Sequence, residues 1–154
     1  MSISNILSTD GVALNVRAHC KREALQQLSR MAASATDHPC DGIFDVLMER
    51  ERLGSTGLGH GVAVPHGKID GLDQVTGVFI RLETPVDFDA LDGEPVDLVF
   101  LLLAPANATA AHLKALAKVA RLLSDSDTRD ALRNADSVED AFAIAATDRK
   151  SNAA

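Results

Sequence analysis

The spacing of apolar residues changes at residue 21, and this change separates a predicted strand from a predicted helix. Between residues 12 and 16 every second residue is a large aliphatic one, which is the spacing of a strand with one buried face. From residue 21 onward apolar residues recur every three or four positions, which predicts an amphipathic helix over Lys21–Ala35. A second helix is predicted to carry Pro39 in its first turn and to end immediately before Gly54.

The remainder of the chain alternates between short apolar runs and longer helical patterns. Strands are predicted over Val62–Val64, Val75–Glu83, Val86–Phe88 and Val96–Leu103. The last of these is apolar almost throughout, as expected of a strand covered on both faces. Three helices should follow, one capped by Asn107 or Thr109 and reaching about Leu123, a short one after Asp125, and one opening at Ser137.

This order of elements predicts a single α/β domain. We expect a mixed β-sheet of about five strands sandwiched between α-helices. The domain should span residues 1–146, and the polar or small residues of 147–154 should form a disordered tail.

Composition and charge narrow the classes of function. The formal net charge is −7 and the chain has no Trp and no Tyr, which argues against nucleic acid as a partner. No apolar run approaches the roughly 20 residues of a membrane-spanning helix, so membrane insertion is not expected. Cys20 and Cys40 form no CxxC pair, and the N-terminus does not resemble a signal peptide, which predicts reduced thiols in a cytoplasmic protein.

A glycine-rich stretch between residues 50 and 68 is the strongest candidate for chemistry. A plain surface turn needs one or two glycines, whereas this stretch holds four before it reaches Pro65, His66, Gly67 and Lys68. Such a loop suits the close approach of an anion such as a phosphoryl group. The candidate phosphate-binding residues of this stretch are Gly54, Ser55, Thr56, Gly57, Gly59, Gly61 and Lys68.

His66 is the candidate nucleophile of this stretch. It follows a strand that Pro65 ends, so its ring should be held at the end of a strand instead of on a flexible loop. A neutral imidazole is nucleophilic when one ring nitrogen is free and an acceptor holds the N–H of the other. Arg50 lies on the apolar edge of the preceding helix and is the better placed cation for an anion, whereas Arg52 is expected to face solvent.

His112 lies in the first turn of the long helix, on the same side as Leu116 and Val119. Two interpretations stay open for this residue, a satisfied core histidine or a second member of the site around His66. The N-terminus of its helix also offers free N–H groups to an anion.

Several other motifs fit the glycine-rich stretch less well. No Gly-Lys-Ser/Thr follows the glycines, and they lie after a helix instead of after a strand, which argues against nucleotide-binding loops. A three-histidine metal site of His60, His66 and His112 lacks a favoured ligand spacing, so we expect no metal and no cofactor. Ser55 is not in the Gly-x-Ser-x-Gly setting of a hydrolase nucleophile.

A resemblance to a known family adds to these predictions. Enzyme IIA domains of the fructose/mannitol class in the bacterial sugar phosphotransferase system have an active-site segment that resembles Arg50…Gly-Ser-Thr-Gly-Leu-Gly-His-Gly-Val-Ala-Val-Pro-His66-Gly-Lys68. The stretch from Gly77 to Pro105 and the helix start His112-Leu-Lys-Ala-Leu are most similar to the nitrogen-regulatory branch. The likeness covers essentially residues 3–146.

The resemblance implies a phosphoryl carrier. It implies that His66 is phosphorylated by the phosphohistidine of an HPr-like carrier protein, and that Arg50 and His112 line the same site. The fold that it implies is a mixed sheet flanked by helices. Two functions follow from it: a regulator whose contacts with transporters or kinases depend on phosphorylation, and, alternatively, a component that relays the phosphoryl group to a sugar-specific IIB domain.

Overall fold

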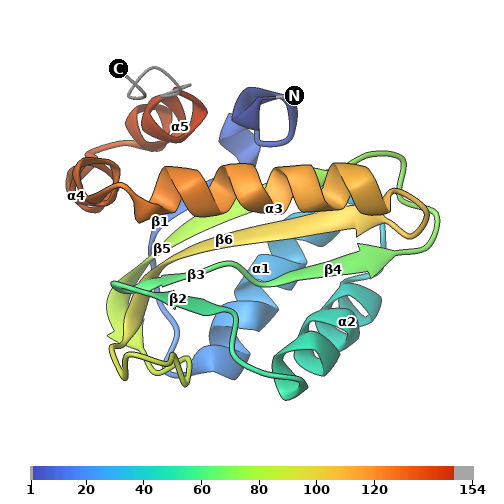
Figure 1. Cartoon of the computed structure of the whole chain (residues 1–154), viewed down its shortest axis with the longest axis horizontal. Coiled ribbons are helices and arrows are strands. Elements are labelled where there is room, and N and C mark those ends of the chain that lie inside the picture. Colours follow the sequence, from blue (N-terminus) through green and yellow to red (C-terminus); the bar gives the residue numbers. More distant parts are fainter. Residues whose placement is uncertain (1, 148–154) are drawn as a thin grey trace.

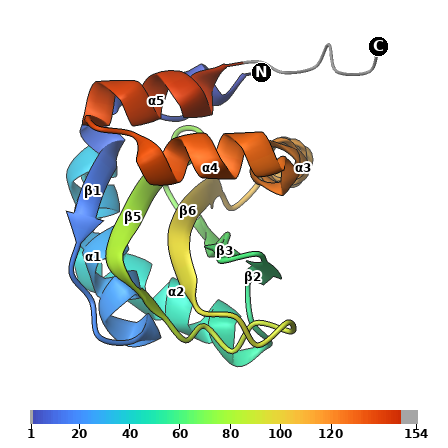
Figure 2. The same cartoon turned by 90° about the vertical axis from the view of Figure 1, so that its left-hand side faces the viewer.

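The chain folds into three layers, with a mixed sheet between two layers of helices (Figure 1). The computed structural model describes residues 2–147. One face of the sheet is covered by α1 (Lys21–Thr36) and α2 (Cys40–Arg52). The opposite face is covered by α3 (Thr109–Ser124), α4 (Ser126–Asn134) and α5 (Val138–Ala146), with the short 3-10 turns η1 (Ile3–Asn5) and η2 (Thr9–Gly11) beside them (Figure 2). The predicted fold class is therefore confirmed.

The sheet has six strands, one more than the sequence predicted. Its path is β1 (Val12–Val16), β5 (Thr76–Val86), β6 (Val96–Pro105), β3 (Val62–Ala63) and β2 (Gly57–Gly59), while β4 (His66–Ile69) pairs with the C-terminal half of β6. Pairs β5–β6 and β2–β3 are antiparallel, and the others are parallel. Strands β3 and β4 form one line along β6 that is interrupted at Val64 and Pro65, with β2 outside β3 and β4 at the edge of the sheet.

Strand β6 divides the hydrophobic core into two halves, because its side chains alternate between the faces of the sheet. Leu98, Phe100 and Leu102 pack in the core beneath α3, whereas Val99 and Leu101 pack in the core beside α1 and α2. The prediction that this run is a strand covered on both faces is confirmed. The position of β6 matters for function, since its C-terminal half carries β4 and its end leads directly into α3.

Several boundaries differ from the sequence predictions. Strands β2 and β4 were not predicted, because neither has the apolar alternation by which a strand is recognised. The separate strand predicted over Val86–Phe88 is wrong: β5 continues through Pro85 to Val86. Proline is tolerated there because the pairing with β6 shifts register between Arg81 and Val86.

Two predicted helix caps also differ. Pro39 is the N-cap of α2 instead of a residue of its first turn. The N-cap of α3 is Ala108, which has no side chain to cap a helix, so neither Asn107 nor Thr109 takes that role. Gly54 does follow the C-cap Leu53 as predicted, with a φ of 147°.

The predicted disordered tail falls almost entirely outside the described residues, which end at Thr147. No helix within residues 2–147 is long and apolar enough to cross a membrane.

Candidate active site

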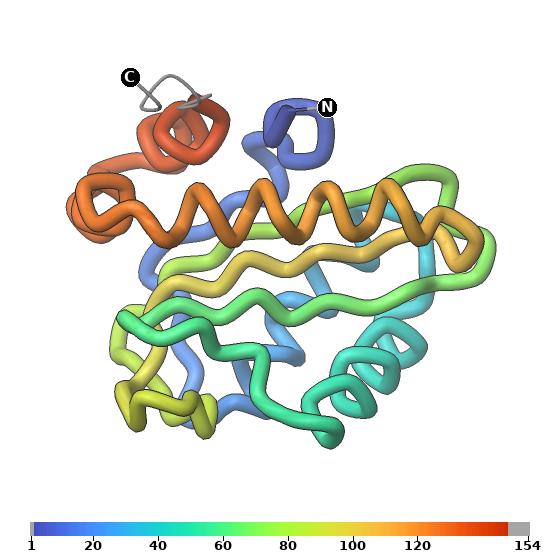
Figure 3. The backbone as a smooth tube through the Cα atoms, in the orientation of Figure 1, coloured from blue at the N-terminus to red at the C-terminus, as the bar shows by residue number. Residues whose placement is uncertain are grey.

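His66 is the first residue of β4 and lies directly after the interruption of the sheet edge at Pro65. The backbone leaves the end of α2, turns through the β2–β3 hairpin and then runs along the edge of the sheet into β4 (Figure 3). On either side of the interruption the edge stays bonded to β6, because Leu102 N donates to Pro65 O at 3.0 Å and His66 is in register with Leu102. The half-buried imidazole of His66 therefore projects from a segment of backbone that is hydrogen-bonded to β6.

Both ring nitrogens of His66 have defined neighbours. Nδ1 lies 2.8 Å from the carbonyl oxygen of Val64, which can only accept, so Nδ1 carries the hydrogen. Nε2 lies 3.3 Å from Nε of Arg50, which can only donate. The two contacts agree on one tautomer, in which Nδ1 is protonated and Nε2 holds a lone pair.

The surroundings of His66 favour this neutral form. Burial is the largest influence and lowers the pKa of His66 below its ordinary value of 6.5. The carbonyl of Val64 opposes the shift, whereas the positive charge of Arg50 adds to it. A neutral imidazole at neutral pH leaves Nε2 available as a nucleophile.

Arg50 reaches His66 from the last turn of α2. Its Nη1 donates to the carbonyl oxygen of Gly54 at 2.9 Å, which orients the guanidinium group. Helix α2 can lie this close to β4 because Gly67 has no side chain: a Cβ there would overlap with Cγ1 of Val46. The glycine after His66 therefore sets the approach of the helix that carries Arg50.

His112 reaches the site from the other helical layer. Its ring centroid lies 5.6 Å from that of His66, with the two rings inclined at 68°. His112 is 6% exposed, and its Nε2 is buried without a hydrogen-bond partner among the described residues. Burial lowers the pKa of His112, and its electrostatic interactions with His66 and Lys68 lower it further. A buried nitrogen without a partner is costly, so His112 is a candidate ligand for an anion at this site.

Lys68 lies two residues after His66 on β4. Its Nζ donates to the hydroxyl of Thr109 at 2.9 Å, so its exposed ammonium group is held over the first turn of α3. The structure thus brings together four of the predicted site residues, namely Arg50, His66, Lys68 and His112.

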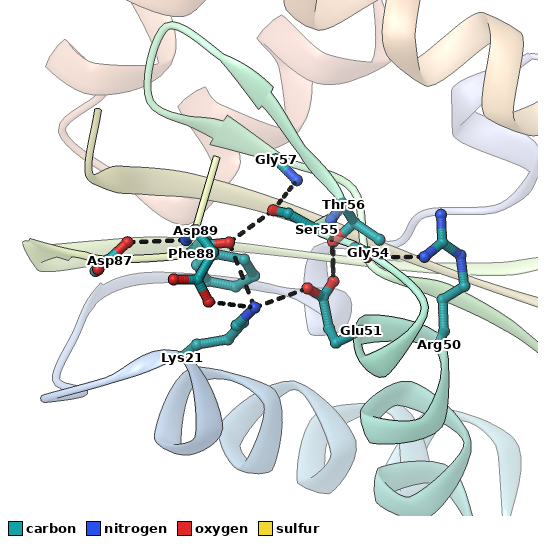
Figure 4. A network of polar contacts seen from close by, with 10 residues as sticks. All are labelled: Lys21, Arg50, Glu51, Gly54, Ser55, Thr56, Gly57, Asp87, Phe88 and Asp89. Atoms are coloured by element: carbon teal, nitrogen blue, oxygen red, sulfur yellow. Dashed lines mark hydrogen bonds and ion pairs between the residues drawn. The ribbon is translucent and has the colours of Figure 1, made fainter. Parts of the chain in front are cut away.

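The hydroxyl groups of Ser55 and Thr56 in the glycine-rich loop donate hydrogen bonds to Phe88 and to Glu51 (Figure 4). Ser55 Oγ donates to the carbonyl oxygen of Phe88 at 2.6 Å, and the hydroxyl of Thr56 donates to Glu51 through a short hydrogen bond. In this structure Ser55 and Thr56 shape the loop beside Arg50.

Three of the predicted phosphate-binding glycines pack against other parts of the fold. A Cβ at Gly57 would lie 2.8 Å from the Cβ of Ala90, and one at Gly59 would lie 3.2 Å from Oδ2 of Asp92. A Cβ at Gly61 would meet Nη2 of Arg133 on α4. Gly54 differs from them, since a Cβ there would meet nothing within 4 Å, but its φ of 147° disfavours other residues.

The structure adds two groups that the sequence did not identify. One is the carbonyl of Val64, the acceptor that holds Nδ1 of His66, and no side-chain pattern marks a backbone group. The other is Glu51, which is buried in the last turn of α2. The sequence does contain an indication that Glu51 is buried. It follows the buried residues Ile43 and Leu47 at four-residue spacing, which places all three on the same side of α2.

The arrangement offers an anion a guanidinium group and an imidazole. Within residues 2–147 no group of three or more His, Cys, Asp or Glu side chains could hold a metal ion. The exposed His60 lies in the β2–β3 turn, where its N–H donates to Asp92 and its carbonyl oxygen accepts from Arg133. A nucleophilic nitrogen, a guanidinium group and a buried unpartnered imidazole instead converge on one point at the sheet edge.

Comparisons with known proteins identify relatives of this chain. Residues 5–147 match the family described as phosphoenolpyruvate-dependent sugar phosphotransferase system, EIIA 2. The nitrogen regulatory protein of Bradyrhizobium diazoefficiens is 47% identical over 133 residues, which cover 86% of this chain and 87% of the relative. That of Escherichia coli is 40% identical over 145 residues, which cover 94% of this chain and 89% of the relative.

Solved structures agree with these relatives. Nitrogen regulatory protein IIA-Ntr from Neisseria meningitidis superposes with a TM-score of 0.88 at 41% identity, covering 92% of this chain and 97% of that one. IIA mannitol from Escherichia coli shares the fold, with a TM-score of 0.76 at 22% identity over 90% of this chain and 98% of that one. Sequence and fold together show that this chain belongs to the EIIA 2 family of the phosphotransferase system and is a phosphotransferase component similar to its nitrogen regulatory proteins.

Proposed function

We propose that this protein is a phosphoryl carrier and regulator that accepts a phosphoryl group on Nε2 of His66 from the phosphohistidine of an HPr-like protein. The observation that carries the proposal is the single tautomer of His66, with Nδ1 bonded to Val64 O at 2.8 Å and Nε2 left with a lone pair. Arg50 lies at that lone pair, 3.3 Å away. A long N–H···N contact of this kind is weak and is readily exchanged for a charged phosphoryl oxygen.

The transfer needs no proton to move at the nucleophile. The lone pair of Nε2 forms the new bond to phosphorus while the donor's N–P bond breaks, and the electron pair of that bond returns to the donor imidazole. Arg50 then donates to the equatorial oxygens, and the unpartnered Nε2 of His112 gains a partner among them. Val64 O keeps the ring in place throughout, since its bond to Nδ1 is not used in the reaction.

A protein donor fits the surface around the site. Leu53, three residues after Arg50, is 80% exposed, and Leu113, next to His112, is 61% exposed. Exposed leucines in the segments that carry Arg50 and His112 suit contact with an apolar patch of another protein. A donor that carries its own phosphohistidine would bring the phosphoryl group to His66 as such a surface docks.

The proposed regulation of partner proteins depends on the negative charge that phosphorylation adds. Phosphorylation adds roughly two negative charges to the site, and the chain already has a formal net charge of −7. Surfaces of transporters or kinases that contact this face would therefore distinguish the two forms. We favour this role over relay to a sugar-specific IIB domain because the relatives at 40–47% identity are named nitrogen regulatory proteins.

Mass spectrometry tests the proposal directly. The protein is incubated with phosphoenolpyruvate, enzyme I and an HPr-like carrier, and one acid-labile phosphoryl group is expected at His66. The exchange His66→Ala should abolish labelling, while His60→Ala, which changes an exposed histidine six residues away, should leave it intact. Continued labelling of the His66→Ala protein would refute the assignment.

The alternative function needs a different acceptor. A titration of the labelled protein with sugar-specific IIB domains would show whether the phosphoryl group moves onward. Transfer to a IIB domain as fast as the loading step would favour relay in sugar uptake, whereas phosphorylation-dependent binding of a transporter or kinase would favour regulation.

A further inference from the structure

Glu51 is a buried carboxylate that the mechanism above does not use. Its side chain is 4% exposed, although it belongs to the last turn of a helix whose neighbouring residues Arg50 and Arg52 reach the surface. Burying a charge is costly unless the group is paired and hydrogen-bonded. The position of Glu51 therefore calls for partners and for a reason why a charge is kept there.

Three donors satisfy this carboxylate (Figure 4). Oε2 accepts from Nζ of Lys21, the first residue of α1, at 3.0 Å. Oε1 accepts from the backbone N–H of Thr56 at 3.2 Å and from the Thr56 hydroxyl through a short hydrogen bond. Lys21 is saturated in turn, since Nζ also contacts Asp89 Oδ2 at 3.2 Å and the carbonyl oxygen of Phe88 at 3.3 Å.

One route leads from this carboxylate to the imidazole of His66. Glu51 fixes Thr56 at its N–H and its hydroxyl, and the carbonyl oxygen of Thr56 accepts from the N–H of Val64 at 3.0 Å. The carbonyl oxygen of Val64 then accepts from Nδ1 of His66 at 2.8 Å. The group that sets the tautomer of the nucleophile is thus connected to Glu51 through a single intervening residue.

A second route leads from the same carboxylate to Arg50. The carbonyl oxygen that orients Arg50 belongs to Gly54, two residues before Thr56. Packing does little to hold Gly54, because a side chain there would meet nothing within 4 Å. The loop is held instead by Thr56 on Glu51 and by Ser55 on the Phe88 carbonyl.

We propose that Glu51 is a positioning residue for phosphoryl transfer at His66, acting through Thr56 on both the imidazole and Arg50. This inference rests on the proposed function. A carboxylate with a merely structural role would change stability and leave the folded protein as active as before. A positioning role requires a slower chemical step in a variant that is still folded.

The charge of Glu51 supplies a readout that does not depend on a phosphoryl donor. Burial lowers the pKa of His66, and the negative charge of Glu51 opposes this shift. Removing that charge should lower the pKa of His66 further, which a titration followed by NMR would detect. The amide resonance of Thr56 should also move in Glu51→Ala, because it loses a carboxylate acceptor.

The experiment compares Glu51→Ala and Glu51→Gln with Glu49→Gln. Glu49 lies on the same helix, but its side chain is 63% exposed and contacts only Arg52 among the described ion pairs. Single-turnover labelling over a range of concentrations of a phosphorylated HPr-like donor gives the limiting rate constant of transfer (written kcat) and the half-saturating donor concentration (written KM). We expect kcat of Glu51→Ala to fall roughly ten- to a hundredfold, the effect of misplacing a reacting group by about 1 Å. KM should stay unchanged because Glu51 is buried, Glu51→Gln should be intermediate, and Glu49→Gln should match the wild type.

The outcomes separate this inference from the proposed function. A folded Glu51→Ala protein that is labelled at the wild-type kcat would overturn the positioning role while leaving His66 as the acceptor. If Glu51→Ala does not fold, Thr56→Val is measured in its place. This variant removes only the hydrogen bond from the Thr56 hydroxyl to Glu51 and should lower kcat several-fold. A wild-type kcat in Thr56→Val would overturn the inference. If the wild type itself is not labelled at His66, the proposed function fails and the positioning role fails with it.

Discussion

Replacing Arg50 by glutamine removes the positive charge beside the proposed nucleophile and keeps the side chain as far as the position of Nε. The guanidinium Nε is 3.3 Å from Nε2 of His66, so a phosphoryl group on that nitrogen would lie within about 4 Å of the charge. Two unit charges at this distance interact by about 4 kcal/mol at an effective dielectric constant of 20 and by about 1 kcal/mol in water. Because Arg50 and His66 are both partly exposed, we take about 2 kcal/mol, which corresponds to a roughly thirtyfold slower transfer.

A second consequence of Arg50→Gln has a definite sign. The charge of Arg50 adds to the burial that lowers the pKa of His66, so its removal should raise that pKa. The variant is thus expected to be slower to accept the phosphoryl group while its imidazole becomes more basic. A rate loss caused only by reduced nucleophilicity would require the opposite shift in basicity.

The assay combines labelling rates with an NMR titration of His66. Arg50→Lys keeps the charge but not the bonds to Gly54 and His66, and should lie between the wild type and Arg50→Gln. Arg52→Gln is the matched control, since Arg52 is 73% exposed on the same helix and pairs with Glu49. A wild-type rate in a folded Arg50→Gln protein, or a lowered pKa of His66 in that variant, would refute the reasoning.

Three further predictions concern the surroundings of His66. His112→Leu should slow labelling at His66 yet leave the free energy of unfolding unchanged or raise it by about 1 kcal/mol, because a buried nitrogen without a partner is removed; a destabilised variant with a wild-type rate would instead make His112 a core residue. His66 and His112 both have pKa values lowered below 6.5, so the unfolded chain binds more protons and stability should fall as the pH decreases below 6.5. Urea melts between pH 7.5 and pH 5 would check this, and a gain in stability on acidification would contradict it. Gly67→Ala should destabilise by about 1–3 kcal/mol through overlap with Val46, whereas Gly42→Ala, where a Cβ meets nothing within 4 Å, should be neutral or stabilise by up to about 1 kcal/mol in thermal melts.

The helices and central strands could be predicted because their signal is local. The helical spacing after residue 21 and the unbroken apolar run that became β6 each carry their own pattern of burial. Strands β2 and β4 were not predicted, because their extended conformation depends on hydrogen bonds to β3 and β6, respectively. A short polar or glycine-rich segment has no periodicity of its own, so a partner distant in the sequence decides its conformation.

The candidate site could be predicted in part for the same reason. His66, Arg50 and Lys68 belong to one continuous stretch whose glycine density marks it, whereas the position of His112 on the inner side of its helix was compatible with two roles. The ring contact at 5.6 Å between His66 and His112 exists only because the fold brings the first turn of α3 beside the start of β4. Sequence spacing does not contain that geometry.

The sequence by itself determined the fold class and the family resemblance and singled out His66 as the candidate nucleophile, since each rests on local periodicity or on a continuous motif. Only the tertiary structure decided which ring nitrogen of His66 is free, because the answer depends on Val64 O and Arg50 Nε reaching the two nitrogens from different elements. It also showed that the hydroxyl groups of Ser55 and Thr56 donate to the carbonyl oxygen of Phe88 and to Glu51. Hydrogen bonds between distant segments form only once the hydrophobic core has placed them, so no reading of single residues could assign those partners.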